Sequence, residues 1–268
     1  MQLGLPSGLS SFGERLNEIG FERTRRAVAG LALSLFVSLY LLVALNAPEG
    51  LAPAMVALAA CYGVAFVGVV SEWFWGRWFA IGLGWSGVMV AIASLAMLGW
   101  TPVLAVYGGV HALVVLALLG KKMAARYDLQ EAWRQRYNMD EFGVARLRKT
   151  VTRAAASLPS LILWALGPKE GRGVALAVGA VAALALGAAG VRGLVKLRSW
   201  GVLALAGALT LVASFGHIGA FLSDFHIDEI GPAQALVDLA GPTLATAFLA
   251  AAVLPLTGAI RRYLHRSA

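Results

Sequence analysis

The chain is poor in charge and in cysteine. Only 13% of its 268 residues are charged and 59% are hydrophobic, whereas a soluble globular domain carries about 25% charged residues. This composition excludes an ordinary soluble domain. The single cysteine, Cys61, excludes an internal disulfide and any redox mechanism that needs a pair of thiols. A lone thiol in an apolar run is expected to pack as a small hydrophobic side chain.

Charged side chains are also missing from the middle of the apolar runs. These runs recur at about the 20 residues that a helix needs to cross ~30 Å of hydrocarbon. Because lipid offers the backbone no hydrogen bonds, such segments are expected to be helical. The sequence therefore predicts an all-α, polytopic membrane helix bundle with eight transmembrane helices, at residues 27–46, 52–71, 78–99, 102–120, 151–167, 174–191, 201–222 and 239–260.

Basic residues lie on one side of this bundle. When the N-terminus is placed in the cytoplasm, all of the 22 Lys and Arg residues except Lys169 and Arg172 fall on the inner side. The positive-inside rule therefore predicts that both termini are cytoplasmic. The weakest predicted span is 151–167, which is short and contains Pro159. The Ala, Gly and Leu bias and the short outer loops favour a bacterial cytoplasmic (inner) membrane.

The spans group into two halves of four around one long loop. We expect a cytoplasmic amphipathic N-terminal segment, a first four-span half, a basic cytoplasmic amphipathic loop, a second half and a cytoplasmic tail, at residues 1–26, 27–120, 121–150, 151–260 and 261–268. Trp78 and Trp200 begin similar spans 122 residues apart, as in a parallel 4+4 repeat. The alternative is that Trp and Arg favour the membrane interface in any protein.

The loop at 121–150 has two helical patterns. Leu129, Trp133 and Tyr137 are spaced to form an apolar stripe on one helix. Asp140 is placed to cap a second helix that continues into the fifth span. On that second helix, Arg146, Lys149 and Arg153 share a face.

Trp133, Arg146, Lys149 and Arg153 are therefore the predicted contact residues of the loop. Two interpretations stay open. Basic amphipathic helices bind anionic lipid headgroups, and amphipathic helices also dock into grooves of protein partners, cytoplasmic or membrane-bound. The formal net charge of +8 is explained by residues at the ends of spans, so we expect no nucleic acid partner.

Acidic residues gather in the outer loop at 223–238. Asp224, His226 and Asp228 would point to one side of an extended segment. Such a trio is a candidate site for a divalent cation, although acidic residues also collect outside simply because basic ones are excluded there. We expect no cofactor, since the spans contain no clustered metal ligands and the chain has no phosphate-binding glycine loop.

Small residues form a stripe in the sixth span. Gly179, Ala183 and Gly187 recur at every fourth residue. Helices in lipid associate through close packing of small residues, so this stripe predicts a helix-packing face. A homo-oligomer built on that face is an open expectation.

A Ser and a His lie in short motifs of the third and seventh spans. Gly84-Trp85-Ser86-Gly87 resembles the nucleophile motif of rhomboid intramembrane proteases, and Gly216–Phe221, with His217, resembles the histidine helix of that family. The resemblance implies a Ser86–His217 dyad. Counting ~1.5 Å per residue from the span ends separates the two by ~12 Å along the membrane normal. The second span also lacks the His and Asn that the family pattern expects.

His111 is the other histidine within a span. Its depth differs from that of His217, which argues against a haem shared by the two. We expect His111 to make a hydrogen bond to a Ser, a Thr or the backbone of another helix.

The spans lack the residues that coupled transport or catalysis would need, and the functional prediction is based on this absence. No buried charge suited to ion coupling and no paired carboxylates for acid–base catalysis are present. We therefore expect a non-enzymatic scaffold or regulatory subunit of a membrane complex. The alternative is a permease or a lipid or small-molecule carrier, since a carrier of apolar substrates needs no buried charge, and an intramembrane enzyme is a minor alternative. A carrier should have a cavity between its halves, and a scaffold should be solidly packed.

Overall fold

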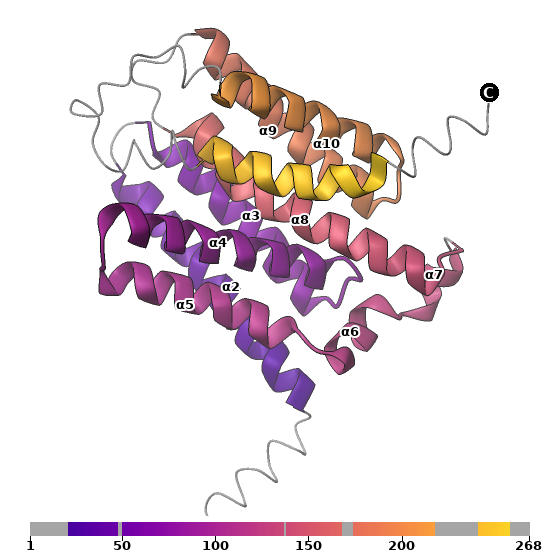
Figure 1. Ribbon diagram of the computed structural model, residues 1–268. Coiled ribbons are helices and arrows are strands. Elements are labelled where there is room, and N and C mark those ends of the chain that lie inside the picture. Colours follow the sequence, from indigo (N-terminus) through magenta and orange to yellow (C-terminus); the bar gives the residue numbers. More distant parts are fainter. Residues whose placement is uncertain (1–20, 48–49, 137, 168–173, 218–240, 258–268) are drawn as a thin grey trace, which may run out of the picture.

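The structure of the chain is a bundle of helices (Figure 1). The computed structural model describes residues 21–47, 50–136, 138–167, 174–217 and 241–257. Its elements are α2 (Phe21–Asn46), α3 (Ala52–Val70), α4 (Gly76–Leu98), α5 (Pro102–Leu118), α6 (Lys121–Asp128), α7 (Glu131–Arg136), α8 (Glu141–Leu166), α9 (Val174–Val195), α10 (Trp200–Leu211), the π-helical turn η1 (Val212–His217) and the apolar helix Gly241–Thr257. The all-α prediction is confirmed for these residues.

Several of these helices are long and apolar enough to cross a membrane. They are α2, α3, α4 and α9, and α5 joins them if it is counted together with α6 across a 74° bend. The protein is therefore a multi-pass membrane protein with four to five candidate spans. The segments Trp200–Gly216 and Gly241–Thr257 are apolar but shorter. The predicted fifth span lies within α8, whose first turns carry charged residues.

Two helix starts follow from local sequence. Thr101 precedes Pro102 and its hydroxyl accepts a hydrogen bond from the Leu104 N–H at 3.4 Å, which begins α5. The Asp140 carboxylate accepts a hydrogen bond from the Gly143 N–H at 2.6 Å. The predicted cap at Asp140 is confirmed, and α8 runs from this loop without a break into the apolar segment.

The loop before Asp140 differs from the prediction. The predicted stripe of Leu129, Trp133 and Tyr137 does not lie on one continuous helix: Leu129 falls between the short helices α6 and α7, and Trp133 lies in α7. Tyr137 lies outside the described residues. Leu129 is 43% exposed, whereas Trp133 is buried. Leu129 and Gln130 separate α6 from α7, and the Asp128 side chain at the end of α6 is buried.

One end of the bundle carries the positive charge. At this end α2 begins, α3 ends, α4 begins and α5 ends, and we call it the basic end. Consecutive long helices run antiparallel (Figure 1), so every Lys and Arg among the described residues lies at the basic end or in α6 and α7 beside it.

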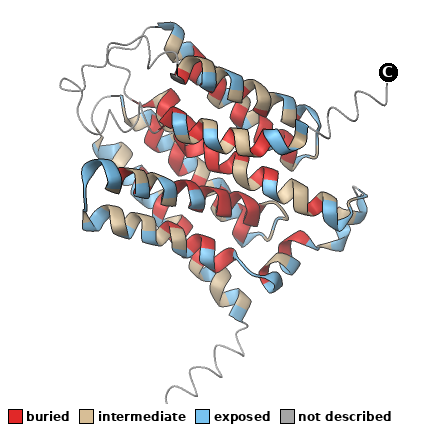
Figure 2. Cartoon of the chain, in the orientation of Figure 1, coloured by how far each residue is buried: buried red, intermediate tan, exposed pale blue. Residues whose placement is uncertain are grey.

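The outward faces of the bundle are apolar. Figure 2 shows buried residues concentrated where the helices face one another. Large aliphatic side chains are exposed around the outside, including Leu31, Val106, Val178, Leu203 and Leu254, each more than 60% exposed. Such a surface is suited to lipid rather than to water.

The small-residue stripe of α9 lies inside the bundle. Ala183 is fully buried. A Cβ added to Gly179 would lie 2.7 Å from the Phe215 ring, and one added to Gly187 would lie 2.7 Å from the Leu161 Cδ1. This face therefore packs against α8 and η1 of the same chain.

Two turns at the basic end share one backbone pattern. Between α3 and α4, Trp73 N–H donates to the Gly68 carbonyl and Gly76 N–H donates to the Trp73 carbonyl. Between α9 and α10, Arg198 N–H donates to the Gly193 carbonyl and Gly201 N–H donates to the Arg198 carbonyl. Glu72 and Leu197, at equivalent places, have φ values of 55° and 56°.

The same turns bring pairs of glycines together. A Cβ on Gly68 would lie 2.9 Å from the Gly76 Cα, and a Cβ on Gly193 would lie 2.7 Å from the Gly201 Cα. Equivalent positions of the two turns are thus 125 residues apart in the sequence, for example Gly76 and Gly201. This corrects the pairing made from sequence, because Trp200 corresponds to Trp75 and not to Trp78.

Candidate functional site

A groove lies between α3 and α4 on one side and α8 and α9 on the other. Its volume is about 820 Å³, within the range of small-molecule binding sites. Twelve of its lining residues are apolar and three are cationic, namely Ala57, Ala60, Cys61, Val64, Trp75, Phe79, Leu158, Ile162, Leu184, Ala188, Val191 and Val195, with Arg192, Lys196 and Arg198. The groove therefore joins segments that are more than 100 residues apart in the sequence.

The cations occupy only the basic end of this groove. Arg192, Lys196 and Arg198 are exposed, and none has an ion-pair partner among the described residues. Along α9 the apolar wall begins at Leu184, ~18 Å from Lys196 at 1.5 Å per residue. That length is close to one leaflet of a ~30 Å hydrocarbon core. The arrangement fits an apolar chain with an anionic head.

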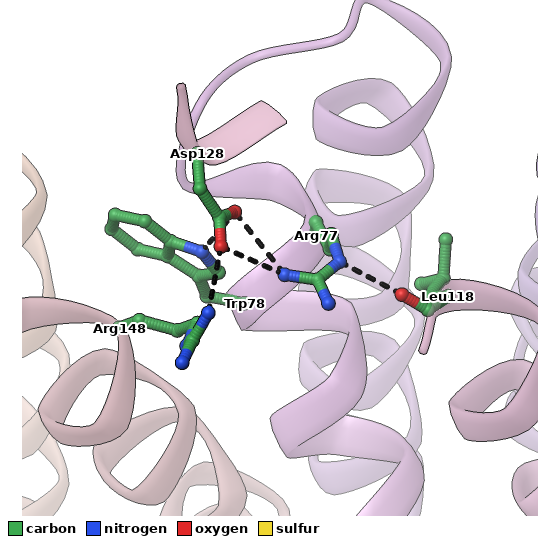
Figure 3. A network of polar contacts seen from close by, with 5 residues as sticks. All are labelled: Arg77, Trp78, Leu118, Asp128 and Arg148. Atoms are coloured by element: carbon green, nitrogen blue, oxygen red, sulfur yellow. Dashed lines mark hydrogen bonds and ion pairs between the residues drawn. The ribbon is translucent and has the colours of Figure 1, made fainter. Parts of the chain in front are cut away.

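A buried carboxylate organises the opposite side of the basic end (Figure 3). Asp128 is 2% exposed and Arg77 is 4% exposed. Arg77 Nη1 donates to both oxygens of Asp128 at 3.2 and 3.0 Å, and Arg77 Nε donates to the Leu118 carbonyl at 2.8 Å. Trp78 Nε1 donates to Asp128 Oδ1 at 2.6 Å, and Arg148 Nη1 donates to Oδ2 at 3.1 Å. The network ties α6 to α4, α5 and α8.

A second acidic residue anchors the neighbouring turn. Arg126 Nη2 donates to Glu72 at 2.7 Å, and Arg26 forms an ion pair with the same carboxylate. Tyr127 donates to the Val69 carbonyl at 2.7 Å. Burial raises the pKa of the Tyr127 phenol, against the opposing effect of the nearby arginines, so this hydroxyl stays a donor at neutral pH. Both acidic residues thus serve to dock α6 on the bundle.

His111 makes a hydrogen bond between helices, as expected, but its partner on the other helix is a tyrosine and not Ser, Thr or backbone. Its Nδ1 lies 2.8 Å from the Tyr107 carbonyl and its Nε2 lies 2.7 Å from the Tyr62 hydroxyl. A carbonyl only accepts, so Nδ1 carries the proton and neutral Nε2 accepts from Tyr62. The Tyr40 and Tyr107 hydroxyls are 3.0 Å apart, and the Phe36 ring centroid is 3.8 Å from that of His111. These contacts link α2, α3 and α5.

The Ser86 and His217 candidates lie on separate parts of the bundle. Ser86 is fully buried in α4, and its hydroxyl has no hydrogen-bond partner in the described part of the chain. The backbone of His217 ends η1. α4 packs mainly on α5 and α8, whereas η1 packs on α9 and α10, so the backbones that carry the two motifs belong to different helix pairs.

The predicted metal residues Asp224, His226 and Asp228 lie outside the described residues. Within the described ranges, no group of three His, Cys, Asp or Glu side chains is placed to hold a metal ion.

The predicted contact residues of the 121–150 loop have different surroundings. Trp133 stacks on Phe74 at 4.3 Å between ring centroids and is 7% exposed, so it packs within the chain. Arg146 lies over the Phe142 ring at 4.8 Å, and Lys149 is exposed. Arg153 Nη1 donates to the Ala251 carbonyl at 2.8 Å. Arg146 and Lys149 are therefore accessible, whereas Arg153 connects α8 to the 241–257 helix.

Sequence reasoning missed the groove and the Arg77–Asp128 pair. The pair had one signal, namely an acidic residue in the middle of a strongly basic loop and an Arg at the start of an apolar span. No family model matches the chain, and searches of curated proteins and of solved structures found no significant match.

Proposed function

We propose that this protein is an eight-span carrier of the bacterial cytoplasmic membrane that binds an anionic amphiphile in the groove between its two halves. The observation that carries the proposal is the shape and charge of the groove, whose apolar walls end in Arg192, Lys196 and Arg198. A solidly packed scaffold would have no such space between its halves. The carrier, the alternative in the sequence analysis, is therefore the better-supported function.

Eight crossings are supported by helix length and charge. The 17-residue segments Trp200–Gly216 and Gly241–Thr257 are ~25 Å long at 1.5 Å per residue, near the lower limit for a span. The apolar part of α8 from Val151 to Leu166 is similar in length. If these segments cross together with α2, α3, α4, α5 and α9, all described Lys and Arg residues face the cytoplasm, as the positive-inside rule favours.

Single-cysteine labelling tests this topology. In a Cys61→Ser background, Lys122→Cys and Lys196→Cys should react with a membrane-impermeant maleimide only from the inner side, and Val174→Cys only from the outer side. Labelling of Lys196→Cys from outside would mean that α8 does not cross, and would contradict the eight-span arrangement.

The ligand class follows from the solvent around the protein. An apolar chain gains little on moving from lipid into an apolar groove, because the lipid is equally apolar. Selective binding must therefore come from the head group of the ligand. The three cations of the groove have no ion-pair partner among the described residues, and they favour a negatively charged head group. The expected ligand has one or more acyl-type chains and an anionic head.

The carrier role is supported by the two equivalent turns. Trp75, from the turn between α3 and α4, lines the groove, and so do Lys196 and Arg198 from the turn between α9 and α10. Transporters built from repeats place their substrate sites at the interface between the repeats. This groove is bordered by both copies of the turn, so it lies at the interface between the two halves, where such a transporter would bind its substrate.

Photo-crosslinking tests the binding. Reconstituted protein is exposed to phosphatidylglycerol with a diazirine in its acyl chain, and labelled residues are mapped by mass spectrometry. Labels should concentrate at 57–64 of α3 and 184–195 of α9. Ala188→Trp should fill the groove and remove most of them, whereas the control Val178→Trp, on the exposed face of α9, should not. Equal labelling of all lipid-facing helices in both variants would contradict the proposal.

The scaffold role remains the second candidate. Its support is the start of α8, where Phe142 is 67% exposed and Arg146 stacks on it, as in a docking face. Replacing Phe142 by Ala together with Arg146 by Glu should release a partner that co-purifies with the wild type. An unchanged set of co-purifying proteins would remove this candidate.

A further inference from the structure

A second hollow lies at the basic end, on the other side of α4. It has a volume of about 530 Å³ and lies between α4, the start of α6 and the start of α8. Five of its lining residues are cationic and none is acidic, namely Arg77, Lys121, Arg148, Lys149 and Arg153. It shares no lining residue with the groove.

Among the described residues, the charge in this hollow is only partly balanced. Asp128 pairs with both Arg77 and Arg148, so one carboxylate serves two guanidinium groups. Lys121 and Lys149 have no ion-pair partner in the described part of the chain. Clustered cations without counter-charge near a low-dielectric interior are costly, and an anion placed among them offsets that cost.

Among the described residues, some guanidinium nitrogens of Arg77 and Arg148 beside the hollow have no hydrogen-bond partner. Figure 3 shows Arg77 using Nε and Nη1, while its third nitrogen, Nη2, makes none of the marked contacts. Arg148 likewise makes its hydrogen bond to the described residues through Nη1. The fixed geometry of these planar groups, held by Asp128, is suited to the oxygens of a phosphate.

The apolar lining indicates that the phosphate belongs to a lipid. Arg77, Ile81 and Trp85 follow at every fourth residue and form one stripe on α4. The stripe runs ~12 Å from the charged end towards the middle of the helix. Trp85, at the far end of the stripe, is 46% exposed. A chain attached to a phosphate at Arg77 would lie along this stripe.

We propose that this hollow binds the phosphate head of an anionic phospholipid, at a site distinct from the groove. Bound there, the lipid joins α4, α6 and α8, the elements that Asp128 also connects. Lipid binding in the hollow does not require the carrier function, because the hollow and the groove have no lining residue in common.

Lipid binding to purified full-length protein tests the proposal. Native mass spectrometry would measure the apparent Kd for phosphatidylglycerol, with phosphatidylcholine as the zwitterionic comparison. Lys121→Ala combined with Lys149→Ala should weaken phosphatidylglycerol binding by roughly fivefold to tenfold, since each is a partly exposed charge contact. Neither lysine forms an ion pair with a described residue, so the double variant should fold as the wild type does. Phosphatidylcholine binding should not change.

Two controls make the result specific. Lys122→Ala removes a neighbouring cation of α6 that does not line the hollow, and should bind phosphatidylglycerol as the wild type does. Lys196→Ala with Arg198→Ala changes only the groove, so a loss confined to that variant would support the carrier site and overturn this one. Equal binding by the Lys121/Lys149 and Lys122 variants would also overturn the proposal.

Inorganic phosphate distinguishes the two sources of the anion. If millimolar phosphate fails to displace phosphatidylglycerol, the lipid is the ligand, as we propose. Displacement that is lost in the Lys121/Lys149 variant would support the anion site and assign it to a free phosphate.

Discussion

Replacing Asp128 by Asn tests how the basic end is held together. The change keeps the size of the side chain but removes the negative charge that faces Arg77 and Arg148. Removing one partner of a buried ion pair typically costs about 3–5 kcal/mol, because the other charge is left buried and uncompensated. Asp128 and Arg77 are 2% and 4% exposed, so this range applies. We expect a loss of about 3 kcal/mol, since Trp78 can still donate to the remaining amide oxygen.

The loss should be visible as a lower melting temperature in detergent. For a chain of this length, 1 kcal/mol corresponds to about 2–4 °C, so Asp128→Asn should melt roughly 6–12 °C below the wild type. Trypsin should also cleave α6 faster at Lys121, Lys122 and Arg126, because α6 would leave the bundle.

Two variants complete this experiment. Glu131→Gln removes an exposed carboxylate of α7 and should change the melting temperature by less than about 1 °C. Asp128→Asn combined with Arg77→Met should recover part of the loss, since both charges are then gone. A melting temperature for Asp128→Asn equal to that of Glu131→Gln would refute the network as the anchor of α6.

Two further predictions concern packing within the bundle. Gly187→Leu should prevent α9 from approaching α8, since even a Cβ would lie 2.7 Å from a leucine methyl group; overpacking costs about 1–3 kcal/mol, whereas Gly63→Leu, where nothing lies within 4 Å, should melt as the wild type does. Equal melting of these two variants would contradict the close approach. Tyr62→Phe should leave His111 Nε2 without its donor, at a cost of about 1–3 kcal/mol, and an unchanged melting temperature would show that this hydrogen bond contributes nothing.

Local signals made some of the fold predictable. The helical class followed from apolar runs, and the start of α8 followed from Asp140, because a cap acts on backbone groups only three residues away. Gly187 was recognised by its spacing, since small residues four apart form one face of a helix. In each case the sequence signal lies within a few helical turns of the structural feature that it produces.

Features that join distant segments could not be predicted in the same way. The groove is lined by Cys61 of α3 and by Ala188 of α9, and no pattern within either helix specifies the other. The burial of Trp133 depends on Phe74 in a distant turn. Spacing alone gave the wrong register of the two similar turns, whereas their backbone hydrogen bonds aligned Trp75 with Trp200.

Movement of a labelled lipid across a membrane is the most direct test of the proposed carrier. Proteoliposomes with a fluorescent anionic phospholipid in the inner leaflet would be followed by dithionite quenching from outside. We predict that the protein accelerates exchange between leaflets, that Ala188→Trp abolishes this acceleration, and that Val178→Trp preserves it. Exchange no faster than in protein-free liposomes, or equal exchange by the Ala188→Trp variant and the wild type, would contradict the account.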